Sequence, residues 1–198
     1  MSPARARTSR GDIVAAARDM LEDGGLEAVS MAGVAVRVGV RPPSLYKHFR
    51  DRNELIGAVA TDIALELGRT FEDAVARCGP SPADRVRALA TAYRGMALAR
   101  PRATALLFAA ISPDATPSAE SQAAAARPIL AAADAIVGPA QALAAARVLT
   151  AFAHGFTSME AAGAFRFGGD VEEAYLLGVA VLLAGLERAT SGDEVSRP

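Results

Sequence analysis

Residues 30–55 read SMAGVAVRVGVRPPSLYKHFRDRNEL, and this stretch carries the clearest signals for the fold of the amino-terminal part of the chain. Gly39 is suited to end one short helix, because glycine readily adopts the backbone that closes a helix. The Pro42–Pro43 pair is suited to open the next helix, since the first N–H groups of a helix have no helical partner. Leu45 and Phe49 are four residues apart and can anchor this second helix on one face. The stretch therefore predicts two short helices joined by a tight turn.

Helix signals continue on both sides of this stretch. Residues 10–25 place apolar side chains on one helical stripe, with Ser9 as an N-cap. Ser30 and Asp51 can cap the following helices, and the later one is predicted to run from about 52 to 77. Proline and glycine punctuation then predicts a loop at 112–121. The same punctuation predicts further helices at about 83–99, 101–111, 118–137, 140–165 and 171–189.

The composition indicates an all-α protein without a metal or cofactor. Of the 198 residues, 52% are apolar and only 5% aromatic. Alanine, the best helix former, is abundant. A single cysteine, Cys78, excludes an internal disulfide and a cysteine-based zinc site, and two histidines are too few for a histidine-rich metal centre. We expect no cofactor, no metal ligand and no catalytic residue.

The sequence also predicts a soluble, cytoplasmic protein that does not enter a membrane. No apolar stretch follows the basic residues at the amino terminus, so a signal peptide is not expected. The longest apolar run, 174–186, has 13 residues, which is too short to span a bilayer.

Charge is distributed unevenly along the chain. Residues 1–52 contain nine basic and six acidic residues, whereas 53–198 contain twelve basic and sixteen acidic ones. This basic segment includes Lys47, the only lysine of the chain. On the second short helix, the polar side chains of Ser44, Tyr46, Lys47 and His48 are expected to point away from the apolar anchors. Hydroxyl, phenol, ammonium and imidazole groups bond phosphate oxygens and base edges. The pattern favours contact between this helix and a polyanion.

The segment resembles the helix-turn-helix of TetR-type transcriptional regulators. The residues that carry the resemblance are Val34-Ala35, Gly39-Val40, Leu45-Tyr46-Lys47-His48-Phe49, Arg52 and Glu54-Leu55. Further along, Ala153-His154-Gly155-Phe156 is similar to a carboxyl-terminal subtype of these regulators that is marked by Trp-His-Gly, although tryptophan is absent here.

The resemblance implies an all-α, two-domain organisation. Residues 1–55 would form a three-helix, helix-turn-helix DNA-binding domain, with the motif at about 31–50 and a fourth helix linking to about 78. Residues 79–198 would form a helical effector-binding and dimerisation bundle. The implied DNA-binding residues are Ser30, Arg41, Ser44, Tyr46, Lys47, His48 and Arg52. Relatives often have a hydroxyl residue where this chain has Arg41, so base preference cannot be transferred from them.

The resemblance further implies a cytoplasmic homodimer that binds palindromic double-stranded operator DNA and pairs through helices 140–165 and 171–189. It would be a repressor released by a small effector, and the low charge of the candidate lining residues favours an apolar or aromatic one. Candidate pocket residues are Phe71, Tyr93, Met96, Phe108, Phe152, His154, Phe156 and Met159.

Other interpretations of these residues remain open. The pocket candidates are also suited to a packed core, Tyr46 to a core aromatic, and His48 to a structural histidine. The alternative function is a helical small-molecule-binding protein, or a small enzyme, without DNA binding. An enzyme is disfavoured because His154 and Glu160 are six residues apart and fall on different helix faces.

Overall fold

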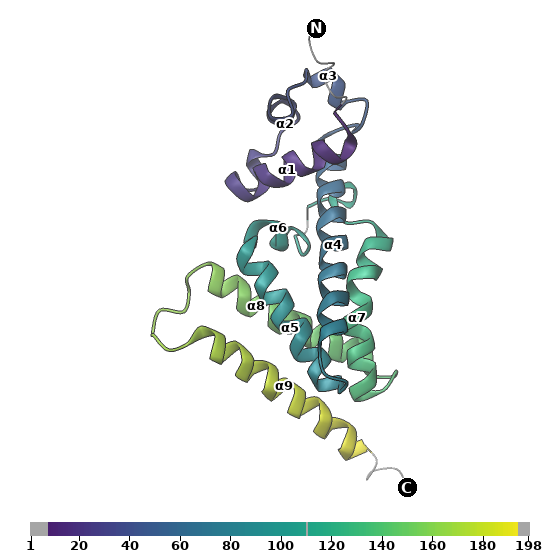
Figure 1. The fold of residues 1–198 in the computed structure, drawn as a ribbon, viewed down its shortest axis with the longest axis vertical. Helices are drawn as coiled ribbons and strands as arrows, with labels where there is room; N and C mark the ends of the chain where they lie inside the picture. Colours follow the sequence, from purple (N-terminus) through teal and green to yellow (C-terminus); the bar gives the residue numbers. More distant parts are fainter. Residues whose placement is uncertain (1–7, 110, 194–198) are drawn as a thin grey trace. The chain divides into compact units, whose positions relative to one another are not determined.

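The computed structural model describes residues 8–109 and 111–193, and side chains as far as Ala189 in the last helix. Every regular element in these residues is a helix, so the expected all-α class is confirmed (Figure 1). The elements are α1 (Arg10–Gly24), η1 (Leu26–Ala28), α2 (Met31–Arg37), α3 (Pro42–Leu45), α4 (Arg52–Arg77), α5 (Pro82–Ala99), α6 (Pro101–Leu106), η2 (Pro113–Ala115), α7 (Ala119–Val137), α8 (Ala142–Ala161) and α9 (Val171–Asp193). Within the described ranges, none of these helices combines the length and the apolar character needed to cross a lipid bilayer.

The chain packs as two compact units. Unit 1 contains the described residues up to Ala64 together with Arg102–Gln122, and unit 2 contains Leu65–Pro101 and the described residues from Ala123 onward. Helix α4 runs through both units without a break. These units are defined by which residues pack together and not by function. The predicted boundary near residue 78, between the DNA-binding and effector-binding domains, stays a prediction.

Side-chain oxygens begin the first helices of unit 1, as the sequence predicts. The Ser9 hydroxyl accepts a hydrogen bond from the Asp12 N–H at 3.1 Å, and the Asp12 carboxylate accepts one from the Ser9 N–H at 2.8 Å. The Ser30 hydroxyl accepts from the Gly33 N–H at the start of α2. Such caps satisfy N–H groups that the helix itself leaves without partners. The predicted starts of α1 and α2 are therefore confirmed.

The end of α1 and the start of α6 cap each other. The Glu22 carboxylate accepts hydrogen bonds from the N–H groups of Arg102 and Ala103, at 3.3 and 2.9 Å. In return, the Arg102 guanidinium donates to the carbonyl oxygens of Glu22 and Asp23, both at 2.7 Å. A negative group thus lies at a helix N-terminus and a positive group at a helix C-terminus, which the helix dipoles favour. This exchange attaches α6 to unit 1.

Two predicted helices are too long. The predicted helix 101–111 ends as α6 at Leu106, after which N–H groups bond carbonyls three residues back in a tighter turn. The predicted helix 140–165 ends as α8 at Ala161. There Gly163 has a φ of 64°, and the Ala164 N–H donates to the Met159 carbonyl at 2.9 Å. This glycine-terminated helix end was not recognised in the sequence.

The predicted loop at 112–121 is instead packed against α4. It contains η2 and the start of α7, and Ala115 is buried. The Ser118 N–H donates to the Thr61 hydroxyl at 3.0 Å. The Asp114 carbonyl oxygen approaches Gly57 of α4 so closely that an added Cβ atom would collide with backbone. Only glycine therefore fits at this crossing.

Unit 2 is held together by helix pairs of α5, α8 and α9. The Arg94 guanidinium of α5 donates to both carboxylate oxygens of Glu160 on α8, at 3.0 and 2.6 Å. The third guanidinium nitrogen of Arg94, Nη1, lies 3.2 Å from the Glu172 carboxylate of α9. An alanine-rich contact joins α7 to α8 through Ala133, Val137, Ala145 and Ala146.

We predict that Gly57→Ala lowers the free energy of unfolding by about 1–3 kcal/mol, because the backbone of residues 114–116 must move to admit the methyl group. Denaturant unfolding measures this effect. Gly95→Ala on α5 is the matched control, since no atom lies within 4 Å of its added Cβ. There the free energy is expected to stay the same or rise by about 0.5–1 kcal/mol. Equal tolerance of both substitutions would contradict the close contact.

Candidate nucleic-acid interface

The predicted second short helix ends as α3 at Leu45, so of its two predicted anchors only Leu45 lies in α3, and Phe49 lies at the end of the turn that follows. Both side chains are buried. Leu45 is 0% exposed and Phe49 is 1% exposed. Both sit in a core of unit 1 to which α1, α2 and α4 also contribute. The Phe49 N–H donates to the Leu45 carbonyl at 3.0 Å, so the turn after α3 remains helical in its hydrogen bonding. The predicted anchoring role of this pair is confirmed by their burial.

Three polar residues lie exposed between the anchors. Tyr46 is 55% exposed, and Lys47 and His48 are exposed as well. The interpretation of Tyr46 as a core aromatic is therefore wrong. The backbone that holds these side chains is fixed at both ends by burial, so the phenol, ammonium and imidazole groups are presented to solvent together.

The remaining candidates lie at the starts of α2 and α3. Arg41 is exposed at the N-cap of α3 and makes no capping hydrogen bond with its side chain, as predicted. Ser44 is half-buried. Ser30 is exposed, and because its oxygen already accepts from Gly33, its O–H proton remains the group that can bond a phosphate.

Arg52 is placed differently from the other candidates. Its Nε donates to the Val29 carbonyl at 2.6 Å, and its Nη2 donates to the Leu26 carbonyl at 2.5 Å. The guanidinium is thus directed to the protein's own backbone between η1 and α2. The resemblance alone gave no signal for this, because it concerns a contact 23 and 26 residues away in sequence.

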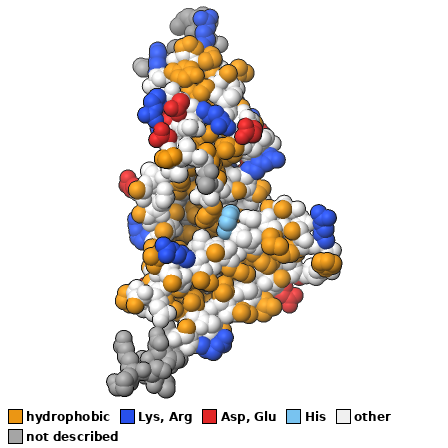
Figure 2. All heavy atoms as spheres, turned by 180° about the vertical axis from the view of Figure 1, so that it is seen from behind, with side chains coloured by type: hydrophobic (Ala, Val, Ile, Leu, Met, Phe, Trp, Pro, Cys, Tyr) orange, Lys and Arg blue, Asp and Glu red, His pale blue; other side chains and the backbone are white. Residues whose placement is uncertain are grey.

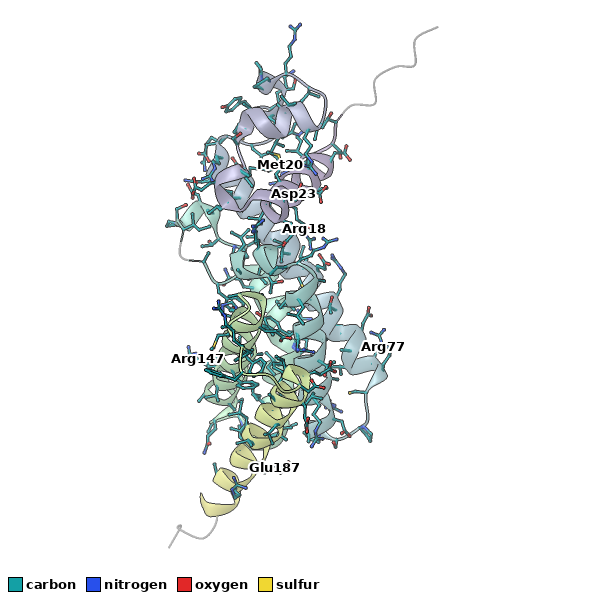
Figure 3. All side chains as sticks on the ribbon, turned by 90° about the vertical axis from the view of Figure 1, so that its left-hand side faces the viewer. Arg18, Met20, Asp23, Arg77, Arg147 and Glu187 are labelled. Carbon is teal, nitrogen blue, oxygen red and sulfur yellow. The ribbon has the colours of Figure 1, made fainter. Side chains whose placement is uncertain are left out.

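Several basic side chains of unit 1 form ion pairs with carboxylates, and such pairs reduce the positive charge that a polyanion can contact. Arg18 on α1, labelled in Figure 3, lies 3.0 Å from Asp62, and Arg37 lies 3.2 Å from Asp23. Arg50 has three acidic neighbours within 4 Å, namely Asp51, Glu54 and Asp114. Within the part of the chain that the structure describes, Arg41 and Lys47 form no ion pair. The charges of these two exposed side chains are therefore not compensated by a carboxylate among the described residues.

Arg10 is a further cation near α3 that the sequence analysis did not single out. Its guanidinium carbon lies 4.5 Å from the centre of the Phe49 ring. This cation–π contact connects the first residue of α1 to an anchor of α3. The signal in the sequence was only the general excess of arginine near the amino terminus.

Two predicted pocket residues form a hydrogen-bonded pair in unit 2. The Tyr93 hydroxyl and the His154 Nδ1 are 3.0 Å apart. Burial raises the pKa of Tyr93 to about 12 and lowers the pKa of His154 below its ordinary value. Both groups are consequently neutral near pH 7, because burial disfavours the charged form of each.

Two more pocket candidates belong to an aromatic cluster. The rings of Phe152 and Phe156 are 5.7 Å apart, and they lie 5.5 and 5.2 Å from the ring of Tyr175 on α9. Phe165 lies 4.7 Å from Phe156. Sequence reasoning expected one face of the last helix to pack on its own domain, but it did not single out Tyr175 on that face or Phe165 after α8. The cluster joins α8 to α9, so Phe152 and Phe156 contribute to the packing of unit 2.

The other pocket candidates are dispersed. Phe71 is buried, Met96 is half-buried and Met159 is exposed, all in unit 2. Phe108 belongs to unit 1 and is largely exposed. The effector pocket therefore stays a prediction. Glu160, considered for acid–base chemistry, is instead bonded through both oxygens to Arg94. The described residues contain no group of three potential metal ligands.

Comparison with known proteins agrees with this geometry. Residues 13–59 match the family model described as bacterial regulatory proteins, tetR family, and residues 86–182 match that of the tetracyclin repressor-like C-terminal domain. A search of curated proteins finds no match.

Several solved structures are similar over nearly the whole chain. A protein with unknown function from Rhodococcus sp. RHA1 is 27% identical with a TM-score of 0.79, covering 94% of this chain and 100% of that one. BioQ of Mycobacterium smegmatis is 27% identical with a TM-score of 0.69, covering 91% and 99%. A TetR variant from Acinetobacter baumannii AYE, solved with minocycline, shares the fold at 22% identity and a TM-score of 0.70, covering 92% and 98%.

An exposed polar turn held by buried anchors, in a domain of this fold, defines a helix-turn-helix transcriptional regulator. The chain belongs to the TetR family of bacterial regulators. It is a ligand-responsive, DNA-binding transcriptional regulator, and members of this family are in general not enzymes.

Proposed function

We propose that the chain binds double-stranded operator DNA through α3 and the turn that follows it. The observation that carries this proposal is the exposure of Tyr46, Lys47 and His48 between the buried anchors. Lys47 supplies a compact charge for a phosphate, and the Arg41 guanidinium suits bidentate contact with guanine. Ser30 and Ser44 add hydroxyl groups at the edge of the same surface. Arg52 is left out of this set because its guanidinium is bonded to backbone carbonyls.

We predict that Lys47→Ala weakens binding to all duplexes and reduces the slope of log K against log salt by about one unit, because one phosphate contact is lost. Duplexes selected by the protein from a random-sequence library provide the target, and fluorescence anisotropy at several salt concentrations gives the slope. Arg77→Ala, which removes a cation from the end of α4, is the control and should leave the slope unchanged. Salt-independent binding by the unaltered protein would contradict the proposal.

The active form is proposed to be a homodimer that pairs through α8 and α9. On α8, the exposed positions Ala144, Val148, Ala151, Gly155 and Met159 form one stripe at helical spacing. On α9, Leu177 is 64% exposed and Val181 is 59% exposed, opposite the buried Tyr175 and Val179. Figure 2 shows hydrophobic side chains over much of unit 2 on the face that it draws.

A second copy fits these two faces. Small residues allow close helix approach, and a two-fold axis buries the same apolar patch on both chains. Such a dimer presents two recognition helices to successive major grooves, roughly 34–36 Å apart, which favours a palindromic operator.

We predict that Leu177→Glu converts the dimer to a monomer, since an unpaired carboxylate at the interface raises the dissociation constant roughly 100-fold or more. Sedimentation velocity measures the change. Leu98→Glu replaces a less exposed leucine on α5 and should leave the dimer intact. A Leu177→Glu protein that sediments as the unaltered chain does would exclude this interface.

The effector is proposed to be a small, neutral, apolar or aromatic molecule whose binding releases the repressor from DNA. Supporting this, the polar pair in unit 2, Tyr93 and His154, is neutral near pH 7. The nearby Arg94 charge is compensated by Glu160 and Glu172. A site with these residues offers an incoming molecule little net charge.

We predict that neutral aromatic compounds raise the melting temperature, because a ligand of the folded state stabilises it. The same compounds should weaken binding to the selected duplex by roughly 5–150-fold. Differential scanning fluorimetry identifies them, and their carboxylated analogues serve as controls without effect. If only the charged analogues shift the melting temperature, the proposed effector class is wrong.

A further inference from the structure

We infer that Arg52 is a positioning residue for DNA binding, which braces the start of α2 against the start of α4, and that it does not contact phosphate. This inference rests on the proposed binding of operator DNA. It replaces the role that the resemblance implies for this position.

The geometry of the guanidinium carries the inference. Arg52 is the first residue of α4, and two of its nitrogens donate to the carbonyls of Leu26 and Val29 at 2.5 and 2.6 Å. These are short, charge-assisted bonds, which are stronger than bonds between neutral groups. The side chain is also partly buried. A phosphate would have to compete with both carbonyls for a group that already donates to the protein's own backbone.

The two accepting carbonyls lie at the entrance to α2. Leu26 begins η1, and Val29 is 2% exposed and directly precedes Ser30, the N-cap of α2. Helix α2 has only seven residues, so its own hydrogen bonds hold it weakly. Arg52 therefore fixes the place at which α2 starts relative to α4.

The consequence for DNA binding follows from the packing of α2 on α3. The Val40 N–H donates to the Ala35 carbonyl at 2.9 Å, so the turn before α3 is attached to α2. The far side of α3 is attached to α4, where the Glu54 carboxylate accepts from the Arg50 N–H at 2.7 Å. Loss of the brace would let α2 shift against α4 and would displace α3, which lies between these two attachments.

The test compares Arg52→Met with Lys47→Met, since each replaces a cation by the same unbranched apolar side chain. Binding to the library-selected duplex is measured at several salt concentrations, at a temperature where circular dichroism shows each protein folded. For Arg52→Met we expect affinity to fall roughly tenfold, from the loss of two hydrogen bonds, with an unchanged salt slope. For Lys47→Met we expect the slope to fall by about 0.9.

Hydrogen exchange of the free protein gives a second readout that needs no DNA. Arg52→Met should speed exchange of the amides in residues 26–33, whereas Lys47→Met should not. A slope that falls by about 0.9 in Arg52→Met would overturn the inference in favour of a phosphate contact. Unchanged affinity in the folded Arg52→Met protein would overturn it in favour of a role in packing alone. If the unaltered protein shows no salt-dependent binding, the proposed function is wrong. The hydrogen-exchange data would then still test whether Arg52 holds the start of α2.

Discussion

The arrangement of the proposed DNA-binding surface depends on the burial of Leu45 and Phe49. Helix α3 has four residues, which is too few for a helix to persist through its own hydrogen bonds. Its position is therefore set by two side chains that are almost completely removed from water. Since Tyr46, Lys47 and His48 occupy the positions between these anchors, their exposure is a direct result of that burial. The functional surface exists because the hydrophobic contact beneath it fixes the backbone.

The electrostatic character of unit 1 results from how its arginines are partnered. A count of charges along the first 52 residues suggests a broadly basic surface. In the folded chain, Arg18 and Arg37 face aspartates, Arg50 faces three carboxylates, and Arg52 bonds to backbone carbonyls. Compensated charges add little to the attraction of a polyanion. Arg41 and Lys47, by contrast, form no ion pair within the described residues, and Lys47 is part of the polar turn.

In unit 2, the polar side chains between the helices are paired with one another, and the surrounding helix surfaces are mostly apolar. Arg94 joins α5 to α8 and α9 through Glu160 and Glu172, and Tyr93 joins α5 to α8 through His154. Because these groups satisfy one another, the rest of α8 and α9 can be apolar on both faces. One face packs within unit 2, and the other carries exposed leucine, valine and small residues.

Short-range patterns were sufficient to predict the all-helical class, the caps at Ser9 and Ser30, and the burial of Leu45 and Phe49, because these depend on spacing and on residues within four positions of one another. They did not predict that Gly163 ends α8 early or that residues 112–121 pack against Gly57. Nor did they predict that Arg52 turns toward Leu26 and Val29. The packing against Gly57 and the direction of Arg52 depend on groups that are distant in sequence and meet only when the helices pack. The end of α8 at Gly163 is instead a local glycine turn that was not recognised in the sequence. An arginine beside a phosphate-binding motif looks the same in sequence whether it faces solvent or a carbonyl, and only the tertiary structure distinguishes the two.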